Sequence, residues 1–173
     1  GIGRVLASVS MTALLALPLS GTAVTLTASG ATTVAIAGTT TMDAVDGVAN
    51  FTGKGVKLTG LIGAKSLTAT ISSPSSIVAT ETVTVTYGAA TKLAISTDAA
   101  DAANRGQFCT QPVFLVQDVS GNLVANSTVV VTPSVSDGTL DGTDVAGVTA
   151  VGGVATFTDL GLTATAGSKT LTF

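Results

Sequence analysis

The sequence predicts an all-β chain that folds as two tandem antiparallel β-sandwich domains. Short stretches rich in Val, Thr and Ile recur along the 173 residues, and clusters of Gly, Ser, Asp and Asn separate them. No stretch keeps apolar residues at the i, i+3, i+4, i+7 spacing of a helix for three turns. Many short strands with a turn about every 8 to 12 residues are typical of a sandwich or a barrel.

An internal repeat divides the chain into two copies. Residues 44–52 return as residues 150–158 with seven of nine positions identical, and residues 58–68 return as residues 162–172 with six of eleven identical. Each copy of such a repeat is expected to form one folding unit. We therefore expect one domain at residues 1–88 and a second at residues 89–173, joined by the small residues 88–91.

The first copy contains six expected strands after residue 20. Residues 23–27 and 32–37 are rich in β-branched side chains, and the Gly-containing stretch 53–55 separates residues 47–52 from residues 56–61. A Ser-Ser-Pro-Ser-Ser turn separates residues 65–71 from residues 77–87. Because side chains alternate along a strand, Val83, Val85 and Tyr87 are expected to face one way.

The second copy contains six more expected strands, of which the last has no successor. We expect strands at residues 92–96, 113–117, 128–132, 145–151, 153–158 and 169–173. Pairs such as Gly152-Gly153 supply the positive φ angles that tight hairpin turns require. The counterpart of residues 77–87 would lie beyond residue 173, so the second domain is expected to lack its last strand.

The N-terminal residues 5–19 are apolar at every odd position, whereas Ser8, Ser10 and Thr12 occupy even positions. Together with Arg4 this run imitates a secretory signal peptide, but its period of two predicts a strand. The run has about 15 residues, fewer than the roughly 20 that a membrane-spanning helix needs. No membrane span is therefore expected.

The apolar N-terminal strand and the open second domain lead to two alternatives. A sandwich without one strand exposes a groove and unpaired backbone groups. Either further repeats of the same chain complete it, or residues 5–19 of one subunit complete the open domain of the next and form a head-to-tail filament. In the second alternative the donor strand carries Val5, Val9, Met11, Leu15 and Leu17.

Composition excludes several classes of function. Seven basic residues against ten acidic ones leave a net charge of −3, so the chain has no basic stripe for nucleic acid. Without His, neither an imidazole metal site nor the usual Ser or Cys catalytic triad can assemble. Glu81 is the single Glu and the Asp residues lie in turns, which disfavours a glycosidase carboxylate pair. We expect no enzyme activity and no cofactor.

A few polar residues remain as candidate sites. Asp137, Asp141 and Asp144 fall within eight residues and are a weak candidate for Ca²⁺, although their spacing matches no established calcium loop and a solvated loop is the default. Asn50 and Asn126 begin N-glycosylation sequons. The single Cys109 is expected to be a small buried apolar residue that enters a strand.

Several stretches of the second copy carry a family resemblance. Residues 91–96, 111–124, 153–160 and 167–173 resemble tandem bacterial Ig-like repeats of the invasin and intimin kind. The resemblance implies two immunoglobulin-like (Ig-like) sandwiches in a protein of the cell surface, such as an adhesin or a surface layer. Such turn and strand signatures specify a fold and not a ligand.

The resulting expectation is a non-enzymatic extracellular structural module, part of a self-assembling surface layer, filament or stalk. Its partners would be other copies of itself or further repeats of the same chain. Two alternatives stay open: an adhesin module that binds glycan or host protein, and an Ig-like decoration domain of a phage or virus.

Overall fold

The computed structural model describes residues 12–14, 20–71 and 77–173, and these residues form an all-β structure. Antiparallel pairing joins every strand to its neighbours, which confirms the predicted fold class. The chain divides into two compact units, Gly1–Gly88 (unit 1) and Ala89–Phe173 (unit 2). Among the described residues, no helix is long and apolar enough to cross a membrane.

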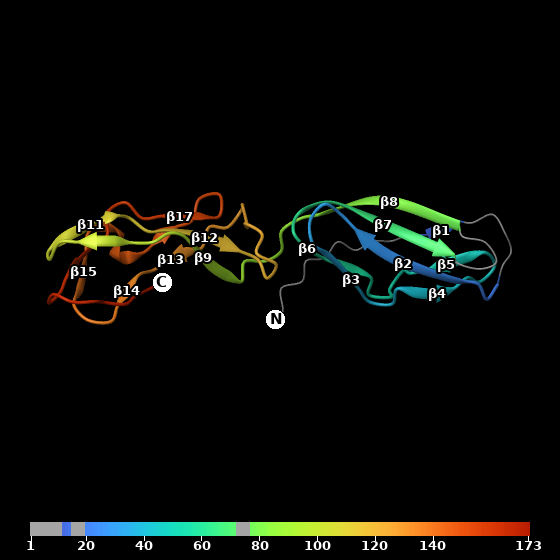
Figure 1. Cartoon of the computed structure of the whole chain (residues 1–173), viewed down its shortest axis with the longest axis horizontal. Helices are drawn as coiled ribbons and strands as arrows, with labels where there is room; N and C mark the ends of the chain where they lie inside the picture. The colour runs from blue at the N-terminus through green and yellow to red at the C-terminus, as the bar shows by residue number, and fades with distance from the viewer. Residues whose placement is uncertain (1–11, 15–19, 72–76) are drawn as a thin grey trace. The chain divides into compact units, whose positions relative to one another are not determined.

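The described residues of unit 1 form one four-stranded sheet and two strand pairs. The sheet has the order β4-β2-β7-β8, and the pairs are β3–β6 and β1–β5 (Figure 1). The strands are β1 (Thr12–Leu14), β2 (Ala23–Ser29), β3 (Val34–Ala37), β4 (Thr41–Asp43), β5 (Val48–Asn50), β6 (Lys57–Gly60), β7 (Gly63–Ile71) and β8 (Ile77–Val85).

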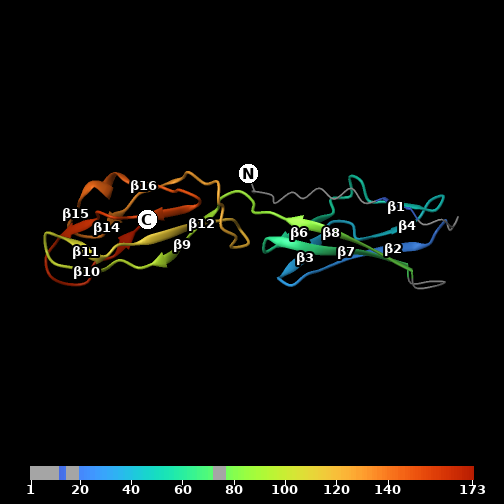
Figure 2. The same ribbon diagram turned by 90° about the horizontal axis from the view of Figure 1, so that it is seen from above.

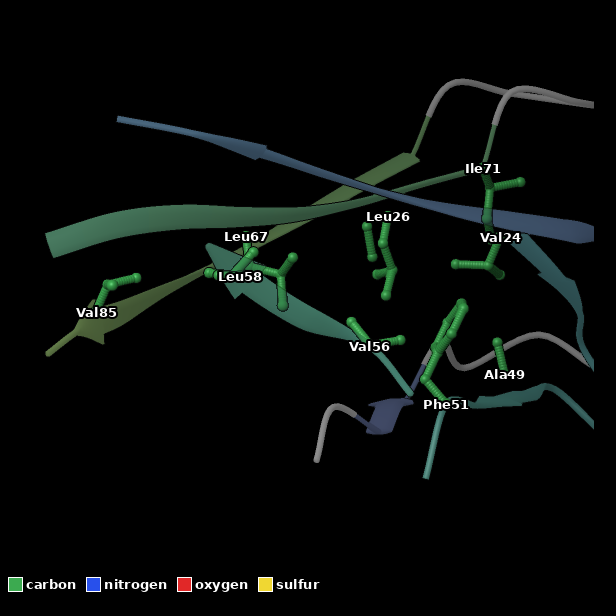
Figure 3. Close-up of a cluster of buried hydrophobic side chains, with 10 residues drawn as sticks. Val24, Leu26, Ala49, Phe51, Val56, Leu58, Leu67, Ile71 and Val85 are labelled. Carbon is green, nitrogen blue, oxygen red and sulfur yellow. The ribbon is translucent and has the colours of Figure 1, made fainter. Parts of the chain in front are cut away.

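The core of unit 1 lies between two layers of strands. Along β7 the odd-numbered side chains from Lys65 to Ile71 are buried, as the period of a half-buried strand requires. Figure 3 shows the side chains of β2 and β7 on one side of this core, with Phe51 and Ala49 reaching in from the other. The predicted sandwich-like packing is therefore present in unit 1.

Strand β8 forms one edge of the sheet that covers this core. It pairs with β7 along all nine of its residues, from Gly63↔Val85 to Ile71↔Ile77. Val85 is buried, and Ile77 and Val83 pack against the core from the same strand. Strand β7 thus has a neighbour on both edges, β2 and β8.

The strands of unit 2 are mostly short, two to six residues each. Its sheets have the orders β10-β11-β18-β15 and β17-β12-β9, with the pairs β13–β16 and β14–β19; Figures 1 and 2 both show β9 beside β12. The elements are β9 (Lys92–Thr97), β10 (Ala100–Ala102), β11 (Gly106–Thr110), β12 (Val113–Gln117), β13 (Val130–Val131), β14 (Ser134–Val135), β15 (Thr139–Asp141), the 3₁₀ helix η1 (Thr143–Ala146), β16 (Val148–Thr149), β17 (Val154–Thr156), β18 (Gly161–Thr163) and β19 (Leu171–Thr172).

Three phenylalanine rings contact one another in unit 2, the buried Phe114 and Phe157 and the half-buried Phe173. The ring centroid of Phe114 lies 6.1 Å from that of Phe157 and 4.3 Å from that of Phe173. Phe157 and Phe173 meet edge to face at 5.4 Å. Such ring pairs add to the stability that burial alone provides.

The repeat seen in the sequence has a structural counterpart. Val45 and Val48 form an isolated bridge in unit 1, and Val151 and Val154 form the same bridge 106 residues later. Both bridges enclose two residues with positive φ, Asp46-Gly47 in unit 1 and Gly152-Gly153 in unit 2. That conformation matches the type I′ hairpin turn, whose twist fits the flanking strands.

The structure differs from the sequence-based expectation in its short elements. The expected strand at residues 145–151 is wrong in its first half, because residues 143–146 form η1 between Gly142 and Gly147. Six short strands were not expected, namely β4, β10, β11, β14, β15 and β18. Strands of two to five residues are too brief to show an alternation of their own.

Candidate functional site

The three carboxylates of the proposed calcium site contact three different partners. Asp137 forms an ion pair with Lys169. Asp141 accepts a hydrogen bond from the hydroxyl of Thr163. Asp144 turns toward the segment that follows β17. The structure does not bring the three together.

No group of three or more His, Cys, Asp or Glu side chains in the described ranges is placed to hold a metal ion. The carboxylate of Asp144 is already the acceptor for two backbone N–H groups, those of Thr158 and Asp159, at 2.6 and 2.8 Å. Calcium prefers six to eight oxygen ligands around one centre. The calcium hypothesis therefore has no geometric basis, and we propose no calcium site.

Asp159 and Asp144 instead bind two segments of unit 2 reciprocally. The carboxylate of Asp159 accepts hydrogen bonds of 2.9 Å from the backbone N–H and the hydroxyl of Thr143. The same carboxylate accepts one from the side-chain amide of Gln107. The hydrogen bond from the Thr143 backbone is the main reason why the pKa of Asp159 lies below its ordinary value. Each Asp thus fixes the loop that carries the other.

Asp118 closes the turn after β12. Its side chain is fully buried and accepts hydrogen bonds from the backbone N–H groups of Ser120 and Asn122, each at 2.9 Å. The amide of Asn122 donates to the other carboxylate oxygen at 3.0 Å. The side chain of Asp118 thus satisfies the backbone of its own turn, as short carboxylates commonly do.

Two lysines occupy equivalent inward positions of the two units. Lys65 lies on β7 and donates to the hydroxyl and the backbone oxygen of Thr32. Lys169 lies just before β19 and pairs with Asp137, and this contact is the chief cause of the lowered pKa of Asp137. The sequence contained a signal for Lys65, because it has the same parity as the buried Leu67 of β7.

Cys109 is exposed, so the expectation of a buried thiol was wrong. It follows Phe108 on β11, and Phe108 is the residue of this pair that belongs to the core. Since neighbouring side chains of a strand point to opposite faces, Cys109 points outward. Asn50 and Asn126, the two sequon asparagines, are also exposed.

The five side chains assigned to a donor strand, those of Val5, Val9, Met11, Leu15 and Leu17, lie outside the described residues. From the middle of that segment, the structure describes β1, which pairs with β5 of the same unit. The register runs from Thr12↔Asn50 to Leu14↔Val48. This part of the segment is a strand of its own unit, and we assign it no donor function.

A hollow surface in unit 2 is the remaining candidate site. It runs between β9, the edge strand of its sheet, and β19. One part, of about 220 Å³, is lined by Ile95, Phe114, Leu171 and Phe173 among others. A second part, of about 520 Å³, adjoins it at Phe173 and includes Leu93 and Val116. We call the two parts together the β9–β19 groove.

The residue types that line the groove are mainly those of an apolar surface. Most of its lining is aliphatic or aromatic, and the titratable side chains at its margin are Lys92, Asp98 and Lys169. A nucleophile with an adjacent base, which covalent catalysis requires, is not among these lining residues.

No protein-family model, curated protein or solved structure matches the chain.

Proposed function

We propose that the chain is a non-enzymatic structural module of an extracellular array, built from two Ig-like sandwich units. The observation that carries the proposal is the recurrence of one hairpin in both units, with the same bridge, the same pair of positive φ angles and the same buried residues around it. Ala44 and Phe51 are buried in unit 1, and Ala150 and Phe157 are buried at the equivalent positions of unit 2. Sequence and structure thus repeat together.

The chemistry of the described surface supports a structural role. Enzymes concentrate groups with perturbed pKa values in a cleft, whereas Asp137 and Asp159, whose pKa values are lowered, serve local contacts of unit 2. The absence of His from the whole chain removes the commonest general base. A module that acts through stiffness and repetition needs neither.

Exposed aliphatic side chains support association between modules. Val45 and Val151, at the tips of the two equivalent hairpins, are exposed, and so are Val78, Ile95 and Val119. All six aromatic side chains lie in the described residues, and each is buried or half-buried. An adhesin that binds its ligand through aromatic side chains at a loop tip is therefore the weaker proposal. No particular observation favours a phage or virus decoration domain.

Sedimentation velocity over a wide concentration range tests the proposal. A structural subunit is expected to self-associate through contacts that bury more than about 1,000 Å² each, and its average mass should rise with concentration. A chain that sediments as a monomer at every concentration would contradict self-assembly. Binding of a glycan or host protein by that monomer would favour the adhesin alternative.

A further inference from the structure

Strand β19 of unit 2 has one strand neighbour where its counterpart in unit 1 has two. Leu171 of β19 is the repeat equivalent of Leu67 of β7. Both pair with an earlier strand of their unit, Leu171 with Val135 of β14 and Leu67 with Ala28 of β2. On its other edge, β7 pairs with β8. Within the described residues, β14 is the strand partner of β19.

Equivalent side chains on β7 and β19 differ in their exposure to solvent. Leu67 and Ala69 on β7 are fully buried, whereas their equivalents Leu171 and Phe173 are half-buried. On the facing strand β9, Ile95 is 61% exposed. Together these three side chains of unit 2 form an apolar surface that the β9–β19 groove leaves open to solvent.

We propose that the β9–β19 groove binds one antiparallel β-strand of the β8 type, supplied by a further stretch of the same repeat sequence. The inference rests on the proposed function, because it names the partner through which such a module joins an array. Strand addition to an open sheet edge satisfies backbone groups and places alternate side chains into pockets. The β7–β8 pairing of unit 1 is the template for the backbone pairing and for the placement of the side chains.

The template specifies the register. In unit 1, Val83 of β8 lies opposite Lys65, Glu81 opposite Leu67 and Ala79 opposite Ala69. Moved onto unit 2, these three side chains would lie opposite Lys169, Leu171 and Phe173, all of which line the groove. A small side chain of the Ala79 type suits the position opposite the Phe173 ring, which already contacts Phe114.

A glycine at the start of β7 and one before β19 are a further similarity between the two units. Gly63 at the start of β7 and Gly167 before β19 both have positive φ, 123° and 134°. In unit 1, Gly63 lies opposite Val85, the β8 side chain that is most deeply buried. A Cβ built on either glycine would meet no atom within 4 Å, so the two positions have the same local surroundings.

A peptide with the sequence of residues 77–87 tests the inference on the full chain. At saturation it should raise the melting temperature by at least about 4 °C, the shift that a stabilisation of 1 kcal/mol gives a domain of this size. Backbone amides of residues 169–173 should exchange at least about tenfold more slowly. A control peptide with Thr82→Pro lacks one backbone donor in mid-strand and should do neither.

Two matched variants locate the binding. Ile95→Asp places a charge in the groove, and Val151→Asp places one at an exposed hairpin tip outside it. The melting shift should disappear in Ile95→Asp and persist in Val151→Asp. An equal shift in both variants would overturn the inference. So would a wild-type chain that dimerises and becomes monomeric on Ile95→Asp, since a second copy would then occupy the groove.

A fusion keeps the test decisive if the free peptide aggregates. A copy of residues 70–87 is placed directly after Phe173, because Phe173 is the repeat equivalent of Ala69. The fusion should melt at least about 4 °C above the same fusion whose copy carries Thr82→Pro. Equal melting, with no peptide binding, would overturn the inference. A chain that binds the strand but never self-associates would refute the proposed function alone.

Discussion

Lys65 is 2% exposed, and its ammonium donates hydrogen bonds to the hydroxyl and the backbone oxygen of Thr32. The equivalent lysine of unit 2, Lys169, has Asp137 where unit 1 has Thr32. One inward position of the repeat thus holds a lysine in both units, with a neutral partner in unit 1 and a charged one in unit 2. A buried ammonium is costly unless its hydrogen bonds are made.

Thr32→Val should destabilise unit 1 by about 1–3 kcal/mol, because it removes the hydroxyl acceptor of the buried Lys65 ammonium. The double variant Thr32→Val/Lys65→Met should recover most of that loss, since it removes the charge and keeps the apolar stem. Tyr87 is the single Tyr, there is no Trp, and Tyr87 lies in unit 1, so its fluorescence during urea unfolding reports this unit. A double variant as unstable as Thr32→Val would contradict the account.

Unit 2 should lose stability in acid through Asp137 and Asp159. Both have a pKa below the ordinary value of 3.8 in the folded chain. The unfolded chain therefore binds protons first, so this stability is present above about pH 3.8 and is lost as pH falls through the lowered pKa values. Urea unfolding of the wild type and of Asp159→Asn from about pH 2 to about pH 7 measures this pH dependence of stability. The variant should be less stable near neutrality and less sensitive to acid.

Gly142→Ala should destabilise unit 2 strongly. Gly142 has a φ of 100°, and a Cβ at this position would lie 2.0 Å from the backbone oxygen of Asp159. The backbone must shift, which would disturb the hydrogen bonds between Asp159 and Thr143, and we expect a loss of more than about 2 kcal/mol. Gly152→Ala is the matched control, because its φ is also positive but no atom lies within 4 Å. Thermal unfolding followed by circular dichroism should rank the two variants in this order.

Calcium should not change the stability of the chain. Asp137, Asp141 and Asp144 are engaged by separate protein partners, so a cation would have to displace contacts that already exist. Melting curves with calcium and with a chelator should therefore coincide. A midpoint that rises with calcium concentration would show preferential binding to the folded chain and restore the calcium site.

Cys109 should react with a thiol reagent in the native chain. It is exposed on β11 and is the single thiol, so one equivalent should be labelled without denaturant. Labelling should leave the melting temperature within about 1 °C of the unlabelled value, since an exposed side chain contributes little packing. Labelling that requires urea would show that Cys109 is buried, as its residue type had indicated.

Sequence patterns identified the strands that possess an alternation or a marked turn. Residues 65–71 and 77–87 were expected as neighbouring strands around a Ser-Pro turn, and β7 and β8 pair along their whole length. The bridge between Val151 and Val154 follows from Gly152-Gly153, whose positive φ angles only a few residue types adopt readily. These features are local, which is why a single sequence reveals them.

Contacts between distant segments were beyond the reach of the same patterns. Asp144 was grouped with Asp137 and Asp141 because they are close in sequence, but the partner of Asp144 is the loop at Asp159. Cys109 was assigned to the core by its residue type. On β11, however, the side chains alternate between the two faces, and because Phe108 points into the core, Cys109 points outward. The β9–β19 groove is lined by β9, β12 and β19, and β19 is distant from the other two in the chain. The sequence alone indicated the groove only as a missing strand.

Negative-stain electron microscopy of the purified chain at high concentration tests the central claim most directly. The chain is proposed to be a repeat module that assembles with copies or further repeats of itself. We predict regular filaments or lattices, with a spacing that persists between preparations. A field of isolated single molecules at the highest soluble concentration would contradict the claim.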